Sequence, residues 1–424
     1  MNRVPLKRLA RIRVSNVDKK SAESEVPVRL CNYTDVYYRD EIAPDQEFMR
    51  ATATPEQVAA FRLRPGDVII TKDSETAEDI GVPTYVRATA SDLVCGYHLA
   101  IIRPEPTKLD GRFLYWFMSS TTAREQLAVA ATGVTRFGLR AESTGAVCVP
   151  SWSLDRQRTI ADYVDTETAR IDALITKKET LSATLDSWWR RTLLQRLGVA
   201  DAPADGAAPW VGRPIPDGWS LRPLRRLVTH SWGGDWGGDP GTGMADLDCV
   251  RAADFDFSSL QAVKGAPRAF DVNTLSSRVL RAGDMVLEKS GGGEGVPVGR
   301  VVAWRGAGDA VPTNFAAGLR PAIDADPDFV VLAFRAAYEV GLPWRSIKQT
   351  TGLQNLDLGH YLTHLWPVPD RQEQSRLAVE LMYFLRQVRG IQNKFYAQLA
   401  LLREHRQALI TAAVTGELGI PGVA

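Results

Sequence analysis

The chain of 424 residues carries nearly the same sequence twice. Four short strings recur in one order and at nearly constant spacing. In the first copy, LRPGDVII begins at 63, TGV at 132, VP at 149 and DRQ at 155. In the second copy, LRAGDMVL begins at 280, TGL at 351, VP at 368 and DRQ at 370. Each copy is too long for a solenoid repeat and long enough to be a domain. The chain is therefore a direct tandem duplication, and we expect two similar domains with two similar working surfaces.

The composition is that of an ordinary globular protein, with 45% hydrophobic and 24% charged residues. No apolar run is long enough to span a bilayer, and the first residues lack the apolar core of a signal peptide. The four cysteines form no CxxC pair and the five histidines no metal-binding motif. We therefore expect a cytoplasmic protein in a reducing compartment, without a metal site or a membrane partner.

Basic residues gather at the start of each copy. Lysines and arginines are opposed only by Asp18 in the first twenty residues, and Arg222, Arg225 and Arg226 open the second copy. Such a segment can contact DNA phosphates, although a solvated basic edge is the alternative for either copy alone. The recurrence in both copies favours phosphate contacts, for which Arg8 and Arg226 are candidates.

Each copy divides into a turn-rich block and a long helix. The blocks contain short β-like runs such as 67–70, 99–102 and 299–304, punctuated by glycine and proline. Each block also holds one expected helix, around 113–129 and 329–338. We expect α+β domains with a mixed or mostly antiparallel sheet. The expected division is a first domain at 1–153, a long helix at 154–198, a linker at 199–216, a second domain at 217–369, a long helix at 370–416 and a tail at 417–424.

The two long stretches follow a heptad pattern that no proline interrupts. At about 1.5 Å per residue, a helix of roughly 40 residues spans about 60 Å. Alone it would expose its apolar seam, so the two helices most simply bury each other. Because the copies arose by duplication, we expect a pseudo-two-fold, antiparallel coiled coil that separates the domains. The candidate residues for this seam and for docking partners are Ile171, Leu174, Leu181, Leu185, Leu381, Val388, Phe395 and Leu402.

Catalytic motifs are missing from the sequence. There is no GxxxxGK[ST] phosphate loop, no [DNS]PP[YFW] methyltransferase motif and no GxSxG nucleophile motif. Asp284, Glu288 and Lys289 are only loosely similar to a metal-dependent nuclease motif, and Thr71 stands where the first copy would need Glu288. We therefore expect a non-catalytic binding scaffold.

The combined pattern is that of a known family. Duplicated GD strands, a TG turn, a VP string leading to DRQ, and the terminal string RQALITAAVTG at 406–416 occur together. The chain resembles, over essentially its whole length, the specificity subunit of type I restriction-modification enzymes. The resemblance implies two target recognition domains that each read half of a bipartite, asymmetric site in double-stranded DNA. It also implies that the long helices space these domains and dock two methyltransferase subunits.

The cofactors implied by the resemblance belong to the partners. The methyltransferase subunits would bring S-adenosylmethionine, and restriction motor-nuclease subunits would bring ATP and Mg, while this chain would bind no cofactor. The alternative is a coiled-coil protein–protein scaffold that reads no DNA. Salt dependence separates the two, because a DNA reader loses affinity steeply with salt and keeps a sequence preference.

Candidate DNA contacts lie just beyond the repeated strings. Lys72 and Lys289 occupy matched positions and suit phosphate contacts, because a shared group cannot distinguish two different half-sites. Arg136 and Asn355 occupy matched positions with different side chains and suit base readout. Arg140 and Gln354 are further candidates beside them.

Overall fold

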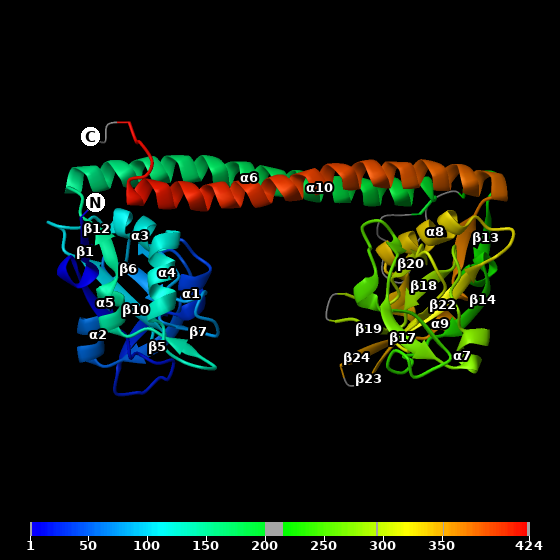
Figure 1. Cartoon of the computed structure of the whole chain (residues 1–424), viewed down its shortest axis with the longest axis horizontal. Helices are drawn as coiled ribbons and strands as arrows, with labels where there is room; N and C mark the ends of the chain where they lie inside the picture. The colour runs from blue at the N-terminus through cyan, green and yellow to red at the C-terminus, as the bar shows by residue number, and fades with distance from the viewer. Residues whose placement is uncertain (1, 200–214, 294–295, 351, 422–424) are drawn as a thin grey trace. The chain divides into compact units, whose positions relative to one another are not determined.

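The computed structural model describes residues 2–199, 215–293, 296–350 and 352–421. Most of the expected linker, 200–214, and Thr351 of the TGL string lie outside the described residues. The chain forms two compact units (Figure 1). Unit 1 is Met1–Lys178 with Ala397–Ala424, and unit 2 is Glu179–Tyr396. Each unit therefore contains one turn-rich block and part of both long helices.

Unit 1 is built around a five-stranded mixed sheet in the order β2-β10-β6-β8-β4. Its strands are β2 (Ala10–Val14), β10 (Leu99–Pro104), β6 (Val68–Thr71), β8 (Pro83–Val86) and β4 (Glu41–Ile42). Only β4 and β8 pair in parallel. A second sheet has the order β5 (Met49–Ala53), β3 (Val26–Cys31) and β9 (Leu93–Cys95). Two small pairs join β1 (Arg3–Pro5) to β12 (Cys148–Pro150) and β7 (Asp73–Ser74) to β11 (Phe137–Gly138).

The helices of unit 1 correct one expectation. They are η1 (Leu6–Arg8), α1 (Tyr33–Tyr37), α2 (Pro55–Phe61), α3 (Gly111–Ser119), α4 (Thr121–Ala130) and α5 (Ala141–Ala146). The single helix expected over 113–129 is wrong, because Ser120 is extended and separates α3 from α4. Its hydroxyl accepts from the Ala123 amide at 3.3 Å and donates to the Phe117 carbonyl at 2.5 Å. A serine bonded in this way caps a helix instead of continuing one.

Unit 2 repeats the topology of unit 1, with a mixed sheet in the order β14-β22-β18-β20-β16 and a second sheet in the order β17-β15-β21. The first sheet comprises β14 (Val228–Gly233), β22 (Ala316–Pro321), β18 (Met285–Glu288), β20 (Val301–Trp304) and β16 (Gln261–Ala262), and the second β17 (Ala266–Phe270), β15 (Ala245–Val250) and β21 (Ala310–Pro312). The smaller strands are β13 (Ser220–Pro223), paired with β25 (Leu365–Val368), and β19 (Ser290–Gly291), β24 (Leu353–Leu356) and β23 (Ile347–Thr350). The helices are η2 (Leu224–Leu227), η3 (Ala252–Asp254), α7 (Val272–Ser277), α8 (Pro327–Glu339), η4 (Leu342–Ser346) and α9 (Leu358–Tyr361). The predicted duplication of a mixed-sheet domain is confirmed.

The repeated GD string holds a buried ion pair in each unit. Asp67 bonds Arg103 at 2.6 Å, and Asp284 bonds Arg320 at 2.7 Å. Each carboxylate also accepts a backbone amide at 2.8 Å, three residues earlier in the chain. The aspartate thus ties the turn before the central strand to the neighbouring strand, so this string has a structural role.

A buried glutamine near the start of each long helix anchors it to its block: Gln157 ends the first DRQ string, and Gln374 lies two residues after the second. The Oε1 atom of Gln157 accepts from the Asp110 amide at 2.8 Å, and that of Gln374 accepts from the Asp326 amide at 3.0 Å. Both aspartates cap the helix that covers the central sheet, α3 or α8. Because both glutamines are almost fully buried, these hydrogen bonds form away from water and fix the direction in which each long helix leaves its block.

The long helices are α6 (Leu154–Arg196) and α10 (Arg371–Thr415). In unit 1, Asp172 pairs with Arg406 at 2.9 Å, and Lys178 bonds Gln398 at 2.6 Å. Contacts that advance along α6 therefore move backward along α10, which is the predicted antiparallel arrangement. Among the described residues, no helix has both the length and the apolar character needed to cross a membrane.

In unit 2 the antiparallel packing continues through polar groups. The amide of Gln392, fully buried, donates to the Ser182 carbonyl at 3.0 Å, and Arg389 pairs with Asp186 at 2.7 Å. The assignment of Leu181 to the apolar seam is therefore wrong. Leu181, assigned to that seam, is 43% exposed, because Ser182 faces α10 in its place.

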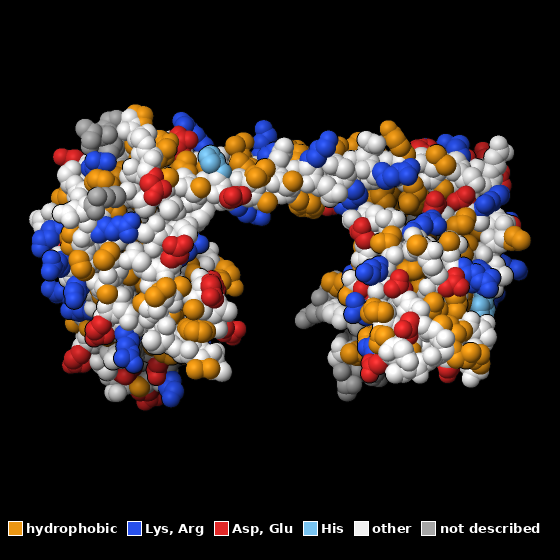
Figure 2. Space-filling model, viewed as in Figure 1, with side chains coloured by type: hydrophobic (Ala, Val, Ile, Leu, Met, Phe, Trp, Pro, Cys, Tyr) orange, Lys and Arg blue, Asp and Glu red, His pale blue; other side chains and the backbone are white. Residues whose placement is uncertain are grey.

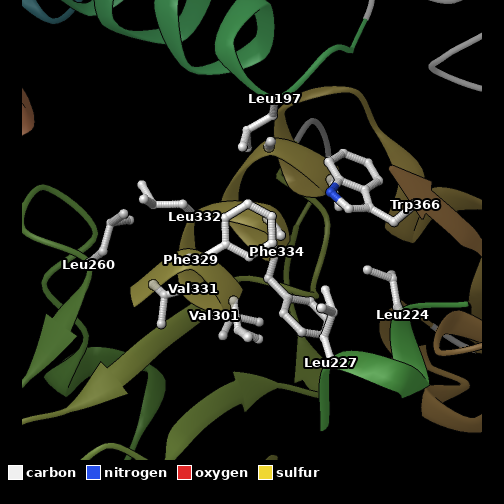
Figure 3. Close-up of a cluster of buried hydrophobic side chains, with 14 of the residues drawn as sticks. Leu197, Leu224, Leu227, Leu260, Val301, Phe329, Val331, Leu332, Phe334 and Trp366 are labelled. Atoms are coloured by element: carbon white, nitrogen blue, oxygen red, sulfur yellow. The ribbon is translucent and has the colours of Figure 1, made fainter. Parts of the chain in front are cut away.

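The ends of the long helices belong to the cores of the units. In unit 2, Trp189 of α6 and Leu197, the residue after its end, join a buried cluster with Phe329 and Phe334 of α8 and with Trp366. Figure 3 shows Leu197, Phe329, Phe334 and Trp366 in this cluster. In unit 1, residues of both long helices share one buried cluster with α3. They are Ile160 and Val164 of α6 and Ile410 and Val414 of α10, which join Phe113 and Phe117 of α3. Each turn-rich block is thus fused to its helices by a common core.

Candidate nucleic-acid interface

The repeated central strand of unit 1 leads directly to the predicted DNA contacts. After β6 ends at Thr71, the Lys72 amide donates to the His98 carbonyl at 3.0 Å, beside the start of β10. The short strand β7 then pairs with β11, which begins one residue after Arg136. The structure therefore brings Lys72 and Arg136, far apart in sequence, to the same end of the sheet.

A cavity of about 410 Å³ lies at this end of unit 1, beside α1. We call it the α1 cavity. Its lining includes Tyr33, Tyr37, Tyr38, Asp73, His98 and Arg136. Tyr33 and Tyr37 stack at 5.4 Å between ring centroids, and Tyr38 meets Tyr37 edge to face. The cavity thus combines an aromatic wall with acidic and basic groups.

Asp73 is held in its ionised form at the base of the cavity. Its Oδ2 atom accepts from the Lys72 ammonium and from His98 Nδ1, each at 2.7 Å. Burial alone would raise the pKa of Asp73, but the hydrogen bonds from His98 and Lys72 outweigh burial and hold the pKa below its usual value. Asp73 is therefore a hydrogen-bond acceptor at neutral pH.

The tyrosine wall is fixed by a hydrogen bond to a carboxylate. The Tyr37 hydroxyl donates to Asp79 at 2.7 Å, and this bond, with a smaller effect of burial, raises the pKa of Tyr37 to about 12. The ring of Tyr38 is 78% exposed at the mouth of the cavity. Tyr37 thus stays protonated and immobile, while Tyr38 offers an apolar face to a ligand.

Unit 2 has the same backbone at the matched place but different side chains. The Lys289 amide donates to the Phe315 carbonyl at 2.9 Å, as Lys72 does to His98. Ser290 follows Lys289, and its hydroxyl donates to Oδ1 of the exposed Asn355 across the strand pair at 2.6 Å. The predicted match of Arg136 to Asn355 is therefore wrong, because Asn355 lies opposite Ser290 where unit 1 has Gly138 opposite Asp73, and Leu353 takes the position of Arg136.

Gln354 has a different environment from its neighbour Asn355. It is 3% exposed, its Oε1 atom accepts from the Val298 amide at 3.1 Å, and its amide group donates to the Gly293 carbonyl at 3.3 Å. Gln354 therefore anchors the adjoining loop, and of the two candidates only Asn355 faces solvent.

Arg8 and Arg226 lie at the opposite end of the central strands. A cavity of about 810 Å³ in unit 1 is lined by Lys7, Arg8, Arg11, Arg64 and Arg103, and one of about 540 Å³ in unit 2 by Arg222, Arg225 and Arg226. Figure 2 shows Lys and Arg side chains gathered along the corresponding edge of unit 1. Arg140 is exposed at the start of α5. The candidates thus form two groups, one at each end of the sheet.

Asp73 and His98 were not predicted from the sequence, because their contact depends on how two strands pair. The one available signal was the comparison of the copies, which places Asp73 against Ser290 and His98 against Phe315. Differences between copies next to an identical string mark a surface that the duplication did not preserve.

No family model matches the chain, and no curated protein matches it by sequence. Solved structures do match. A chain described for complex assembly and conformational transition of the type I R-M system has 16% identity and a TM-score of 0.71, with 98% of each chain covered. The HsdS subunit from Thermoanaerobacter tengcongensis has 17% identity and a TM-score of 0.52, with 98% of this chain and 97% of that chain covered.

The chain has the HsdS fold. The fold predicted from the sequence, two α+β domains with two long helices that form a coiled coil, is confirmed.

In this HsdS fold the eight candidate docking residues on the long helices fall into two classes. Ile171, Leu381 and Val388 are buried within the chain and cannot contact a partner. Leu174 and Leu181 are 49% and 43% exposed, and Leu185, Phe395 and Leu402 are half-buried. Further exposed apolar side chains accompany them on the same helices: Trp188, Val379, Tyr383, Ile391, Tyr396 and Leu401. These helices therefore retain apolar surface that the chain itself does not cover.

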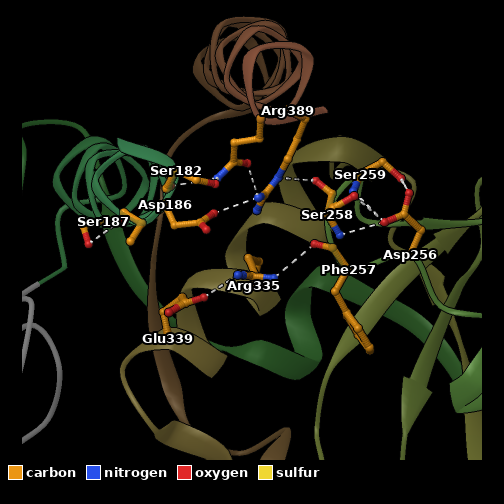
Figure 4. A network of polar contacts seen from close by, with 12 residues as sticks. Ser182, Asp186, Ser187, Asp256, Phe257, Ser258, Ser259, Arg335, Glu339 and Arg389 are labelled. Carbon is orange, nitrogen blue, oxygen red and sulfur yellow. Dashed lines mark hydrogen bonds and ion pairs between the residues drawn. The ribbon is translucent and has the colours of Figure 1, made fainter. Parts of the chain in front are cut away.

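A polar network fixes the turn-rich block of unit 2 on its helices (Figure 4). Arg389 of α10 pairs with Asp186 of α6 and donates to the Ser258 carbonyl at 3.0 Å. Arg335 of α8 pairs with Glu339 at 2.6 Å and donates to the Phe257 carbonyl at 3.3 Å. The loop at 256–259 is thus held by both α8 and α10.

Proposed function

We propose that this chain is the non-catalytic specificity subunit of a type I restriction-modification enzyme, and that each unit binds one half of a bipartite, asymmetric site in double-stranded DNA. One observation carries the proposal. The two units share a buried frame but carry different side chains at one matched edge. A protein that grips two different half-sites with one fold needs this combination.

The shared frame consists of contacts that a reader of any sequence requires. Asp67–Arg103 and Asp284–Arg320 fix the central strands, and Gln157 and Gln374 fix the long helices. The edge shares Lys72 and Lys289 but differs beside them. Asp73, His98 and Arg136 in unit 1 correspond to Ser290, Phe315 and Leu353 in unit 2. Different donors and acceptors on one frame support recognition of different bases.

The exposed apolar side chains of α6 and α10 support docking of methyltransferase subunits. Large apolar groups on a soluble helix commonly mark a protein interface. We place two methyltransferase subunits there, with S-adenosylmethionine bound to them. The motor-nuclease subunits, with ATP and Mg, join through these partners, and this chain holds no cofactor.

The proposal is tested by methylation in cells. The full chain is co-expressed with a type I methyltransferase subunit from the same genome, and cellular DNA is sequenced for N6-methyladenine. We expect one bipartite motif with a fixed spacer that is lost when this chain is deleted. Methylation that persists unchanged without the chain would leave the protein–protein scaffold as the function.

The matched lysines predict unequal phosphate contacts. Lys72 is neutralised by Asp73, whereas Ser290 replaces that carboxylate beside Lys289, and no described carboxylate pairs with Lys289. Lys289→Ala is expected to weaken DNA binding for all sequences and to reduce the slope of log K against log salt by about 1. Lys72→Ala is expected to change the slope less. Binding titrations at several salt concentrations measure both, and equal slope changes would contradict the assignment.

A further inference from the structure

The α1 cavity carries hydrogen-bond acceptors that the protein leaves unused. Lys72 and His98 both bond Oδ2 of Asp73, and no donor among the described residues bonds its Oδ1. Glu75, also in the lining, is exposed and has no partner in the described part of the chain. Asp79 differs from these two because it accepts from Tyr37. Asp73 and Glu75 therefore present free carboxylate oxygens to a ligand.

The lining of the same cavity also includes an arginine, Arg136, whose guanidinium group is available as a hydrogen-bond donor. Arg136 is exposed, lies in the turn before β11, and forms no ion pair with any carboxylate that the structure describes. The tight turn before it is fixed by Gly133, whose φ of 152° and closeness to the Arg136 carbonyl leave no room for a side chain. An arginine that stays unpaired beside carboxylates is available for a ligand that bonds both.

One base pair matches this arrangement in the major groove. Guanine presents the acceptors O6 and N7, to which arginine donates with both arms of its fork. Cytosine, its partner, presents the N4 amino group, which aspartate or glutamate accepts. A·T pairs lack the two adjacent purine acceptors. The stacked tyrosines hold α1 as a rigid wall beside these groups, so little side-chain entropy is lost on binding.

Unit 2 lacks this combination at the matched positions. Ser290, Gly292 and Leu353 stand where unit 1 has Asp73, Glu75 and Arg136. The exposed Asn355, two residues beyond Leu353, has a side chain that suits adenine, which presents N6 and N7. The two units therefore differ at this position in the way that an asymmetric target requires.

We propose that the α1 cavity of unit 1 reads a G·C base pair of its half-site, with Arg136 on guanine and Asp73 and Glu75 on cytosine. The inference rests on the proposed function and deepens it. Arg136 and Glu75 determine specificity at one base pair, and Lys72 and His98 position Asp73.

The test uses the full chain with its methyltransferase subunit and duplexes that carry the motif found by sequencing. Each base pair is replaced in turn, and binding is measured for wild type, Arg136→Ala and Glu75→Ala. The matched controls are Arg124→Ala on α4 and Glu78→Ala in the loop after β7, which remove the same charges outside the cavity. We expect both cavity variants to lose roughly 5- to 150-fold discrimination at one G·C pair, and the controls to keep it.

A base analogue separates base contact from phosphate contact. Placing 7-deazaguanine at that pair removes N7, and we expect it to weaken wild-type binding while leaving Arg136→Ala unaffected. Uniform loss for all sequences in Arg136→Ala would make Arg136 a phosphate contact and overturn the inference, as would unchanged discrimination in both cavity variants. A wild-type chain that yields no bipartite motif would instead refute the proposed function itself.

Discussion

Replacing Trp189 by alanine is expected to lower the free energy of unfolding of unit 2 by about 3–5 kcal/mol. The side chain of Trp189 projects from α6 into the core of unit 2 and is 2% exposed. Its ring centroid lies 5.9 Å from that of Phe384. Truncation removes its apolar area and leaves a cavity among side chains that cannot collapse into it. Chemical denaturation followed by hydrogen exchange of β18 and β22 measures the loss in unit 2 separately from unit 1.

The next residue in the chain provides the control. Trp188 is 53% exposed and touches the same Phe384 edge to face at 4.7 Å. Trp188→Ala is expected to cost about 1 kcal/mol, because only one aromatic contact and part of its area are lost. Under the proposed function it should nevertheless weaken association with a methyltransferase subunit, since Trp188 belongs to the uncovered apolar surface. Equal destabilisation by the two variants would contradict the packing of α6 in unit 2.

The second large effect is expected in unit 1. Asp67→Ala should cost about 3–5 kcal/mol, because it leaves the Arg103 guanidinium beside the sheet without its counter-charge. Asp67 is 1% exposed, and its carboxylate also holds the turn at Arg64. The double variant Asp67→Ala with Arg103→Met should regain most of the loss, since removing both charges leaves no unpaired ion.

An exposed pair in the same unit is the matched control. Arg87 and Glu41 pair at 2.9 Å, but their side chains are 58% and 51% exposed. Glu41→Ala is expected to cost about 0–1 kcal/mol, because solvent screens such pairs. Hydrogen exchange of β6 and β10 measures the stability of this region. A double variant no more stable than Asp67→Ala alone would mean that loss of the turn at Arg64, not the unpaired charge, causes most of the destabilisation.

The sequence predicted the large features because they depend on periodicity and repetition. The heptad pattern predicted long helices at 154–198 and 370–416, and the structure has them at Leu154–Arg196 and Arg371–Thr415. The repeated strings predicted matched strands, but the match of Arg136 to Asn355 was wrong, because Asn355 lies opposite Ser290 where unit 1 has Gly138 opposite Asp73. These predictions needed only local spacing and a comparison of the two copies.

The remaining features depend on contacts between distant residues. The pairing of Asp73 with His98 follows from the register of β10 on β6, which no local pattern encodes. The exposure of Leu181 follows from the turn of α6 that directs Ser182 toward Gln392. The helix break at Ser120 was missed because apolar spacing continues across it, and only the capping geometry distinguishes it from a helical serine.

The core of unit 1 combines residues made early with residues of α10 that are made last, and this has a consequence for biosynthesis. Unit 2 is one continuous segment, 179–396, and can close as soon as that segment has been made. Unit 1 needs Ile410, Ala413 and Val414 to fill the cluster beneath α3, and these residues are made after all of unit 2. The block translated first is thus the one completed later, so a ribosome that stops before residue 397 releases a finished unit 2 and an open unit 1.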